Sequence, residues 1–239
     1  MSGIQNYRLR FGNKNKLSLF CIALGLYYLC RQYNMFAMIN EEIRSIVEKE
    51  ANAVRNIPVT DAYERAVELI EEQVHNMGGA MVISGMGKAG QIAMNIATTF
   101  SSTGTPAYFL HPSEAQHGDL GIMRKNDILL LISNSGKTRE LEELVSLSRG
   151  LVPDVKIIVI TSNPDSPLAK EADVCLLTGA PAEVCPLGLT PTTSTTVMTV
   201  IGDMLVVSVM KRIGFTNADY AKRHHGGYLG EKSREQSRR

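Results

Sequence analysis

The chain has 239 residues, of which 44% are hydrophobic and 21% are charged, which is typical of a globular protein that can bury a core. Its 25 lysines and arginines nearly balance 24 aspartates and glutamates, which excludes the strongly basic surface of a nucleic-acid coat protein. The four cysteines form no CxxC pair and no metal-finger spacing. We therefore expect a reducing compartment and a cytoplasmic location, with no nucleic-acid partner.

The first 37 residues differ in composition from the rest. They carry five basic and no acidic residues, and the 14-residue run Leu17–Cys30 is mostly apolar. A membrane span needs about 20 residues, so this run is short for one. A signal anchor and an ordered extra element are alternatives, but we favour an early start, with translation beginning at Met35 or Met38. We treat residues 1–37 as a doubtful extension and 38–239 as one domain, for which no membrane contact is expected.

Two helices are predicted at the start of this domain. From Met38 onward, isoleucines and valines recur at helical spacing with glutamates between them. A second helix is predicted from about Asp61 to Met77, with Asp61 as its N-cap and Glu64 completing a capping box. Gly78-Gly79 would end this helix.

The central part alternates short apolar runs with stretches that favour helix. The helix-compatible stretches are 88–102, 138–149 and 165–171. Several of the runs are continuously apolar, as in parallel strands buried on both faces. We therefore predict an α/β fold: a five-stranded parallel sheet between two layers of helices. The predicted strands are Ala80–Ser84, Ala107–Leu110, Ile128–Ser133, Lys156–Thr161 and Val174–Leu177.

The C-terminal part returns to helix. Ser194–Ile213 is apolar on all sides, so we expect it to be buried in the core or in a subunit interface. A shorter helix is predicted near Thr216–Arg223. The polar stretch Glu231–Arg239 is expected to be frayed.

Ligands of open parallel sheets bind beyond the carboxyl ends of the strands, and a glycine-rich loop follows the first strand there. Gly85, Gly87 and Gly90 match G-x-G-x-x-G, but the acidic residue that a dinucleotide site needs about 20 residues later is missing. We predict that Ser84, Gly85 and Gly87 contact a ligand. The alternative is a tight turn that only lets helix and strand pack closely.

A second loop, Ser133–Thr138, joins the third strand to a helix. It offers three hydroxyl groups and several backbone N–H groups at a helix N-terminus, which is a geometry that binds anions. A plain N-cap would need only one hydroxyl. We therefore predict that these two loops hold one small phosphorylated ligand, with Ser133, Asn134, Ser135 and Thr138 as phosphate-binding residues.

Three longer segments, together with the two loops, resemble a known family. The loops resemble those of the sugar isomerase (SIS) domain. The segments His111–Gly121, Glu183–Thr192 and His224–Gly230 resemble the arabinose-5-phosphate isomerases of the KpsF/GutQ type. The resemblance spans roughly residues 40–232.

This resemblance implies a flavodoxin-like three-layer sandwich and a homotetramer with active sites shared between subunits. It implies interconversion of D-ribulose 5-phosphate and D-arabinose 5-phosphate for the synthesis of Kdo, a sugar of lipopolysaccharide and capsule. By position in the motifs, it assigns catalysis to Lys88, His117, Glu140 and His224. Next to His224, His225 stands where the family usually has Pro, so either histidine could act.

The reaction moves a proton between C1 and C2 through a cis-enediol and needs a general base and a general acid. Glu140 follows the phosphate loop by two residues, so it should lie near an anchored sugar; the alternative is a partner for the helix dipole. Lys88 could neutralise a phosphate or polarise a carbonyl oxygen. Glu183, in the long loop 179–191, is a further carboxylate that could contact the substrate. We expect no cofactor and no catalytic metal, because no ligand spacing such as HExxH occurs.

Two other functions stay open: an isomerase for a different phosphosugar, and a non-catalytic SIS regulator that binds a sugar phosphate. Such regulators usually carry a DNA-binding helix, and we find no basic recognition helix before residue 80. Most relatives continue into a pair of CBS domains, whereas this sequence stops at Arg239. We therefore expect a short form without regulation through such domains, and a Kdo nucleotide is a candidate feedback ligand for the same cleft.

Overall fold

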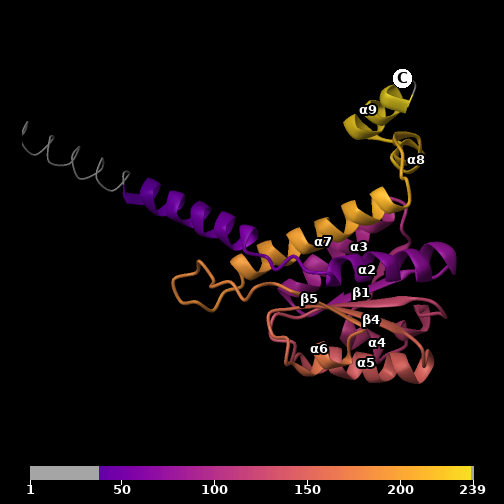
Figure 1. Ribbon diagram of the computed structural model, residues 1–239, viewed down its shortest axis with the longest axis horizontal. Helices are drawn as coiled ribbons and strands as arrows, with labels where there is room; N and C mark the ends of the chain where they lie inside the picture. Colours follow the sequence, from indigo (N-terminus) through magenta and orange to yellow (C-terminus); the bar gives the residue numbers. More distant parts are fainter. Residues whose placement is uncertain (1–37, 238–239) are drawn as a thin grey trace, which may run out of the picture. The chain divides into compact units, whose positions relative to one another are not determined.

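The computed structural model describes residues 38–237 (Figure 1). The expectations for Leu17–Cys30 fall outside these residues. The chain divides into two compact units, Met1–Lys49 and Glu50–Arg239. Residues 38–55 are helical, as predicted from Met38 onward, and the apolar side chains of Ile39, Ile43 and Val47 are exposed.

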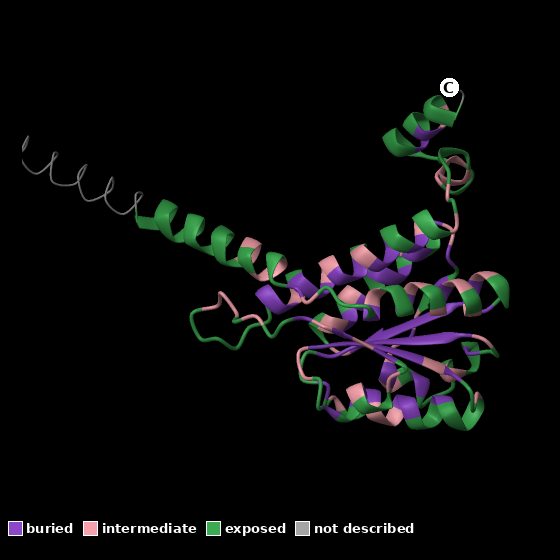
Figure 2. Cartoon of the chain, viewed as in Figure 1, coloured by how far each residue is buried: buried purple, intermediate pink, exposed green. Residues whose placement is uncertain are grey.

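The second unit is built on a five-stranded parallel sheet in the order β2-β1-β3-β4-β5. Its strands coincide with the predicted ones to within one residue: β1 (Met81–Gly85), β2 (Ala107–Phe109), β3 (Ile128–Ile132), β4 (Lys156–Thr161) and β5 (Val174–Leu177). Strands β1 and β3 are buried along their whole length (Figure 2), which explains why their sequences are continuously apolar.

Helices cover both faces of this sheet, so the predicted three-layer α/β sandwich is confirmed (Figure 1). On one face, Leu130 and Ile158 belong to a core that includes α2 (Ala62–Ile70), α3 (Lys88–Ser102) and α7 (Thr193–Arg212). On the other face, Leu129 and Ile157 pack with the shorter elements. These are α4 (Pro112–Ala115), η2 (Asp119–Ile122), α5 (Arg139–Leu151) and α6 (Pro167–Glu171).

The long apolar helix α7 is part of this core. It is long and apolar enough to cross a bilayer, but half of its most apolar 18-residue window is buried inside the fold. Its buried face packs against α2 and α3. Packing within the domain therefore accounts for the apolar composition that was predicted to be buried.

Asp61 stands at the N-cap position of the second helix, as predicted, but the predicted capping box with Glu64 is wrong. Asp61 already has helical backbone angles and makes no side-chain cap hydrogen bond among the described residues; instead it pairs with Arg65. The hydroxyl of Thr60 accepts the hydrogen bond from the N–H of Ala62 at 3.3 Å. The helix also changes to a π-helical turn, η1 (Glu71–Asn76), before it ends.

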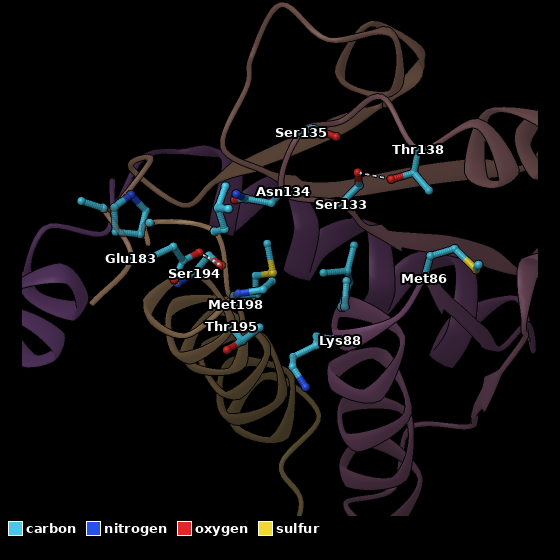
Figure 3. A pocket seen from close by; sticks show the side chains of 17 residues that line it. Met86, Lys88, Ser133, Asn134, Ser135, Thr138, Glu183, Ser194, Thr195 and Met198 are labelled. Atoms are coloured by element: carbon cyan, nitrogen blue, oxygen red, sulfur yellow. Dashed lines mark hydrogen bonds between the residues drawn. The ribbon is translucent and has the colours of Figure 1, made fainter. Parts of the chain in front are cut away.

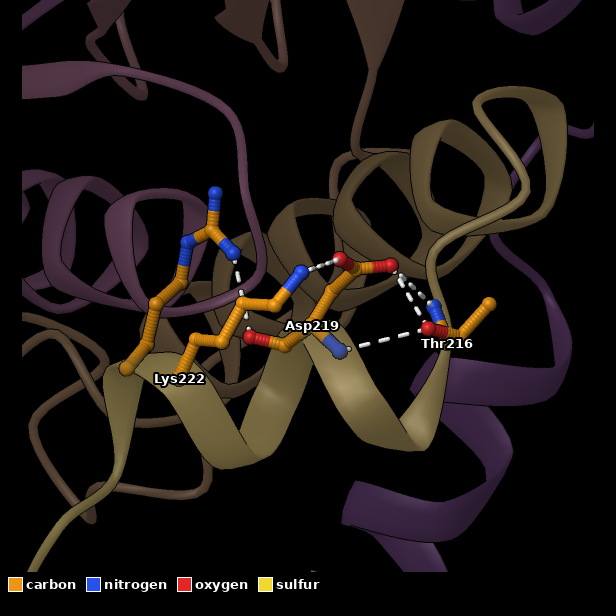
Figure 4. Close-up of polar contacts among 4 residues, drawn as sticks. Thr216, Asp219 and Lys222 are labelled. Carbon is orange, nitrogen blue, oxygen red and sulfur yellow. Dashed lines mark hydrogen bonds and ion pairs between the residues drawn. The ribbon is translucent and has the colours of Figure 1, made fainter. Parts of the chain in front are cut away.

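Two short helices close the chain. Helix α8 (Asn217–Arg223) begins with a capping box in which Thr216 and Asp219 exchange hydrogen bonds, and Lys222 pairs with Asp219 (Figure 4). Helix α9 (Gly227–Ser237) occupies most of the stretch that was expected to be frayed. That expectation was wrong. The helix could not be predicted from the sequence, because it is polar and buries only Gly230 and Ser233 and so carries no amphipathic signal.

Candidate active site

A cavity of about 630 Å³ opens where β1 and β3 end (Figure 3). Its walls come from three places: the loop after β1 with the start of α3, the loop after β3, and the loop that leads into α7. This is the edge of the sheet where the sequence predicted a ligand. The predicted residues that line the cavity are Lys88, Ser133, Asn134, Ser135, Thr138 and Glu183.

The glycine-rich loop is shaped largely by packing. A Cβ at Gly85 would lie 2.8 Å from the carbonyl oxygen of Ala89, and one at Gly90 would lie 2.6 Å from that of Gly85. Glycine at these positions lets the end of β1 meet the start of α3 closely. Ser84 is fully buried and donates a 2.6 Å hydrogen bond to the carbonyl of Leu110. Its hydroxyl is therefore used inside the fold, and the exposed turn at Gly87 is the part of this loop that is open to a ligand.

The loop after β3 is held in one conformation by its own hydroxyl groups. Ser133 Oγ lies 2.8 Å from Thr138 Oγ1 and accepts the N–H of Gly136 at 3.1 Å (Figure 3). Gly136 has a φ of +64°, and a Cβ there would overlap the hydroxyl of Ser166 at the start of α6. The loop thus packs closely against the start of α6.

This loop ends at the N-terminus of α5. Thr138 stands at the N-cap, but within residues 38–237 its side chain makes no cap hydrogen bond to the helix. The N–H of Leu141 donates to the carbonyl of Thr138 at 3.0 Å, whereas the N–H groups of Arg139 and Glu140 have no acceptor among the described residues. These two groups keep their partial positive charge for an anion. Asn134 and Ser135 are exposed beside them. The arrangement is what binding of a phosphate group requires.

The third wall carries Glu183 close to the N-terminus of α7. Its carboxylate accepts hydrogen bonds from Thr192 N at 2.7 Å, Thr192 Oγ1 at 2.9 Å and Ser194 N at 3.2 Å, and a fourth from Ser194 Oγ. Burial raises the pKa of the Glu183 carboxyl, but the hydrogen bonds from Ser194 and Thr192 outweigh burial and hold the pKa below its usual value. Glu183 therefore faces the cavity as a fixed negative charge.

The same loop contains a thiol that was not among the predicted site residues. The hydroxyl of Thr190 and the backbone N–H groups of Thr190, Leu187 and Leu189 lower the pKa of Cys185 to about 6. A thiol with this pKa is mostly thiolate at pH 7 and reacts readily with electrophiles. Its acidity depends on the loop keeping its conformation.

The other three predicted catalytic residues do not line the cavity of this chain. Glu140 is half-buried on the first turn of α5, and His117 is exposed in the turn between α4 and η2. His224 is the C-cap residue that follows α8, and its ring stacks on Tyr220 with the ring centroids 3.7 Å apart. The chain thus brings Lys88, the loop Ser133–Thr138 and Glu183 together and leaves Glu140 and both histidines outside the cavity.

Part of the cavity wall was not predicted from the sequence. Met86, Ser194, Thr195 and Met198 line it together with the predicted residues (Figure 3). The available signal was that residues 192–196 form the start of a long helix, because a helix N-terminus is itself a polar surface.

Comparison with known proteins identifies the family to which this architecture belongs. Residues 78–208 match the family described as SIS domain. The chain belongs to the SIS domain family. Two curated relatives of this SIS domain protein are named arabinose 5-phosphate isomerase KdsD. The protein from Yersinia pestis is 45% identical over 186 residues, which are 78% of this chain and 55% of the relative. The protein from Francisella tularensis is 41% identical over 202 residues, 84% of this chain and 61% of the relative.

Two solved structures are similar to this SIS domain protein over most of its length. A putative phosphosugar isomerase involved in capsule formation from Bacteroides fragilis has a TM-score of 0.79 and 72% identity, covering 80% of this chain and 99% of that one. Escherichia coli CFT073 c3406, solved in complex with arabinose 5-phosphate, has a TM-score of 0.73 and 32% identity, covering 79% and 98%. The chain spans about half the length of the curated relatives that it matches.

Proposed function

We propose that this SIS domain protein interconverts D-ribulose 5-phosphate and D-arabinose 5-phosphate. The observation that carries the proposal is the Ser133–Thr138 loop, which presents uncapped helix N–H groups to a cavity that also holds Lys88 and Glu183. Such a site fits a small phosphorylated ligand with hydroxyl groups. The names of the curated relatives and the sugar phosphate bound to the E. coli protein support the choice of sugar.

The isomerisation needs no redox step. A general base removes the proton from C1 of the ketose while a general acid protonates the carbonyl oxygen at C2, which gives a cis-enediol. Return of the proton to C2 and loss of the proton from the oxygen at C1 then give the aldose. We assign these transfers to Glu140 and His117 or His224, with Lys88 stabilising negative charge on the oxygen that changes protonation.

The position of His224 supports a site shared between subunits. The cavity lies at the N-terminal end of α7, and α8 and α9 lie beyond its C-terminal end (Figure 1). A helix of 20 residues is about 30 Å long. His224 of the same chain is therefore far from Lys88, and a second copy would have to supply this histidine. We propose a homotetramer in which neighbouring subunits complete each other's sites.

The size of the cavity bears on regulation by a second ligand. Its volume of about 630 Å³ falls in the range that holds ligands of drug size. This supports the proposal that a Kdo nucleotide, made from the product downstream, binds the same cleft as a feedback inhibitor. We place the reaction in Kdo synthesis in the cytoplasm.

The test is to follow D-ribulose 5-phosphate and D-arabinose 5-phosphate by NMR with the full chain, in the presence of EDTA. We expect interconversion in EDTA and a loss of about 10²–10⁴-fold in Glu140→Gln and His224→Ala, because general acid–base groups contribute that much. A Kdo nucleotide should compete with the substrate.

Two results would favour the alternatives. Saturable binding of the sugar phosphate without conversion would favour a non-catalytic regulator. Faster conversion of a different phosphosugar would move the assignment to that substrate.

A further inference from the structure

A carboxylate near the N-terminal end of the second unit reaches the base of the loop that covers the cavity. Glu50 Oε1 accepts a 2.8 Å hydrogen bond from the hydroxyl of Thr193, a residue 143 positions further along the chain. Thr193 is 1% exposed, so water does not compete for this hydrogen bond. The other oxygen of Glu50, Oε2, is buried and has no hydrogen-bond partner within the described part of the chain.

Thr193 connects Glu50 to the loop. Its Oγ1 also accepts a 3.1 Å hydrogen bond from the backbone N–H of Val184. A hydroxyl has a single hydrogen, so donating it to Glu50 leaves the lone pairs of Thr193 oriented toward Val184. Glu50 therefore fixes the orientation of Thr193, and Thr193 fixes the backbone at Val184.

Val184 directly follows Glu183, which accepts four hydrogen bonds from Thr192 and Ser194 on either side of Thr193. Residues 183–184 and 192–194 thus clamp the two ends of the loop 185–191. Leu187 and Leu189 in the middle of this loop are 76% and 78% exposed, so apolar packing adds little to hold it. The conformation of the loop depends on the clamp.

We propose that Glu50 is a positioning residue that acts through Thr193 and Val184 to hold Glu183 and the loop 185–191 in place at the cavity. A buried carboxylate oxygen without a partner costs free energy, so Glu50 should contribute to the geometry of the site more than to global stability. The effect on turnover rests on the proposed isomerase function.

The first experiment compares turnover in matched variants of the full chain. Glu50→Gln keeps an oxygen that can accept from Thr193, whereas Glu50→Leu does not. Thr193→Ser keeps the hydroxyl, whereas Thr193→Val removes it at nearly constant shape. We expect Glu50→Leu and Thr193→Val to lower kcat by about tenfold or more with a smaller change in KM, because the phosphate loop is untouched. Glu50→Gln, Thr193→Ser and the control Glu48→Leu, at an exposed position, should stay within about threefold of the wild type.

The second experiment uses Cys185 as a reporter that is independent of activity. We would measure the rate of alkylation by iodoacetamide against pH and identify the labelled cysteine by mass spectrometry. The wild-type midpoint should lie near pH 6, because the loop holds the pKa of the Cys185 thiol at about 6. In Glu50→Leu and Thr193→Val the midpoint should rise toward the ordinary value of a thiol, and in Glu48→Leu it should not move.

The outcomes separate the two proposals. A folded Glu50→Leu variant with wild-type kcat and an unchanged Cys185 titration would overturn the positioning role. Equal losses in Glu50→Gln and Glu50→Leu would also overturn it, since the accepted hydrogen bond would then not be what matters. If the wild-type chain isomerises no pentose phosphate, the proposed function fails, while the Cys185 titration still decides the role of Glu50.

Discussion

Glu183 is the residue whose ionisation ties the stability of the cavity wall to pH. Its carboxylate accepts four hydrogen bonds from Thr192 and Ser194, and these hold its pKa below the usual value against the opposing effect of burial. In the unfolded chain the pKa of a glutamate is about 4.3. A folded pKa that is lower than the unfolded one stabilises the protein above the unfolded pKa, and this stabilisation is lost as the pH falls through the folded value.

We therefore predict that Glu183→Gln destabilises the protein at pH 7 and that this destabilisation shrinks as the pH falls below about 4. The amide cannot supply the negative charge that the four donors stabilise, whereas at low pH the wild-type carboxyl is itself neutral. Urea denaturation of both proteins at pH 7 and at about pH 3.5, below the unfolded pKa, would measure the difference in the free energy of unfolding. A difference that is the same at both pH values would show that the ionised form is not specifically stabilised.

At the scale of elements, the contact between α3 and α7 depends on one glycine. Gly202 lies in the middle of α7, and a Cβ there would overlap Cγ1 and Cδ1 of Ile96, which is 2% exposed. Glycine thus lets the two helices approach closely at the cost of helix propensity.

We predict that Gly202→Ala lowers the free energy of unfolding by about 1–2 kcal/mol, because overpacking a buried contact costs more than the roughly 1 kcal/mol of helix propensity that alanine adds. In the Ile96→Ala background the overlapping atoms are gone, so Gly202→Ala should become neutral or stabilising. A double-mutant cycle measured by urea denaturation gives the coupling. Additive effects of the two substitutions would mean that Ile96 does not limit the helix contact.

The sequence predicted elements well where the pattern is local. The strands were found because β1 and β3 are buried on both faces. The loop Ser133–Thr138 was correctly placed between a strand and a helix, because a strand, a hydroxyl-rich turn and a helix follow one another directly. The wall formed by Ser194 and Thr195 was missed. Its role depends on hydrogen bonds to Glu183, more than ten residues earlier, and on the link from Thr193 to Glu50. No pattern within one element encodes such contacts.

At the scale of the whole molecule, the placement of His224 raises the question of which chain supplies it. The resemblance of the sequence assigned four residues to one site, and the structure of a single chain places only Lys88 of these four on the cavity. Helix α7 separates the cavity from α8, at the end of which His224 stacks on Tyr220. Sequence motifs cannot show this separation, because they carry no information on which subunit a residue serves.

A shared site predicts that two inactive variants restore each other. In a mixture of Lys88→Ala and His224→Ala chains, consider a site that takes Lys88 from one subunit and His224 from its neighbour. This site is intact when the first subunit carries His224→Ala and the neighbour carries Lys88→Ala. Random reassembly of equal amounts should therefore recover about a quarter of the wild-type sites. We would unfold the variants together, refold them and measure isomerisation by NMR. Lys88→Ala mixed with Ser133→Ala is the matched control, because both residues line the cavity of the same chain and no intact site can form. Recovery in the first mixture alone would place His224 across an interface, whereas no recovery in mixed oligomers shown to contain both variants would mean that His224 acts within its own chain or not at all.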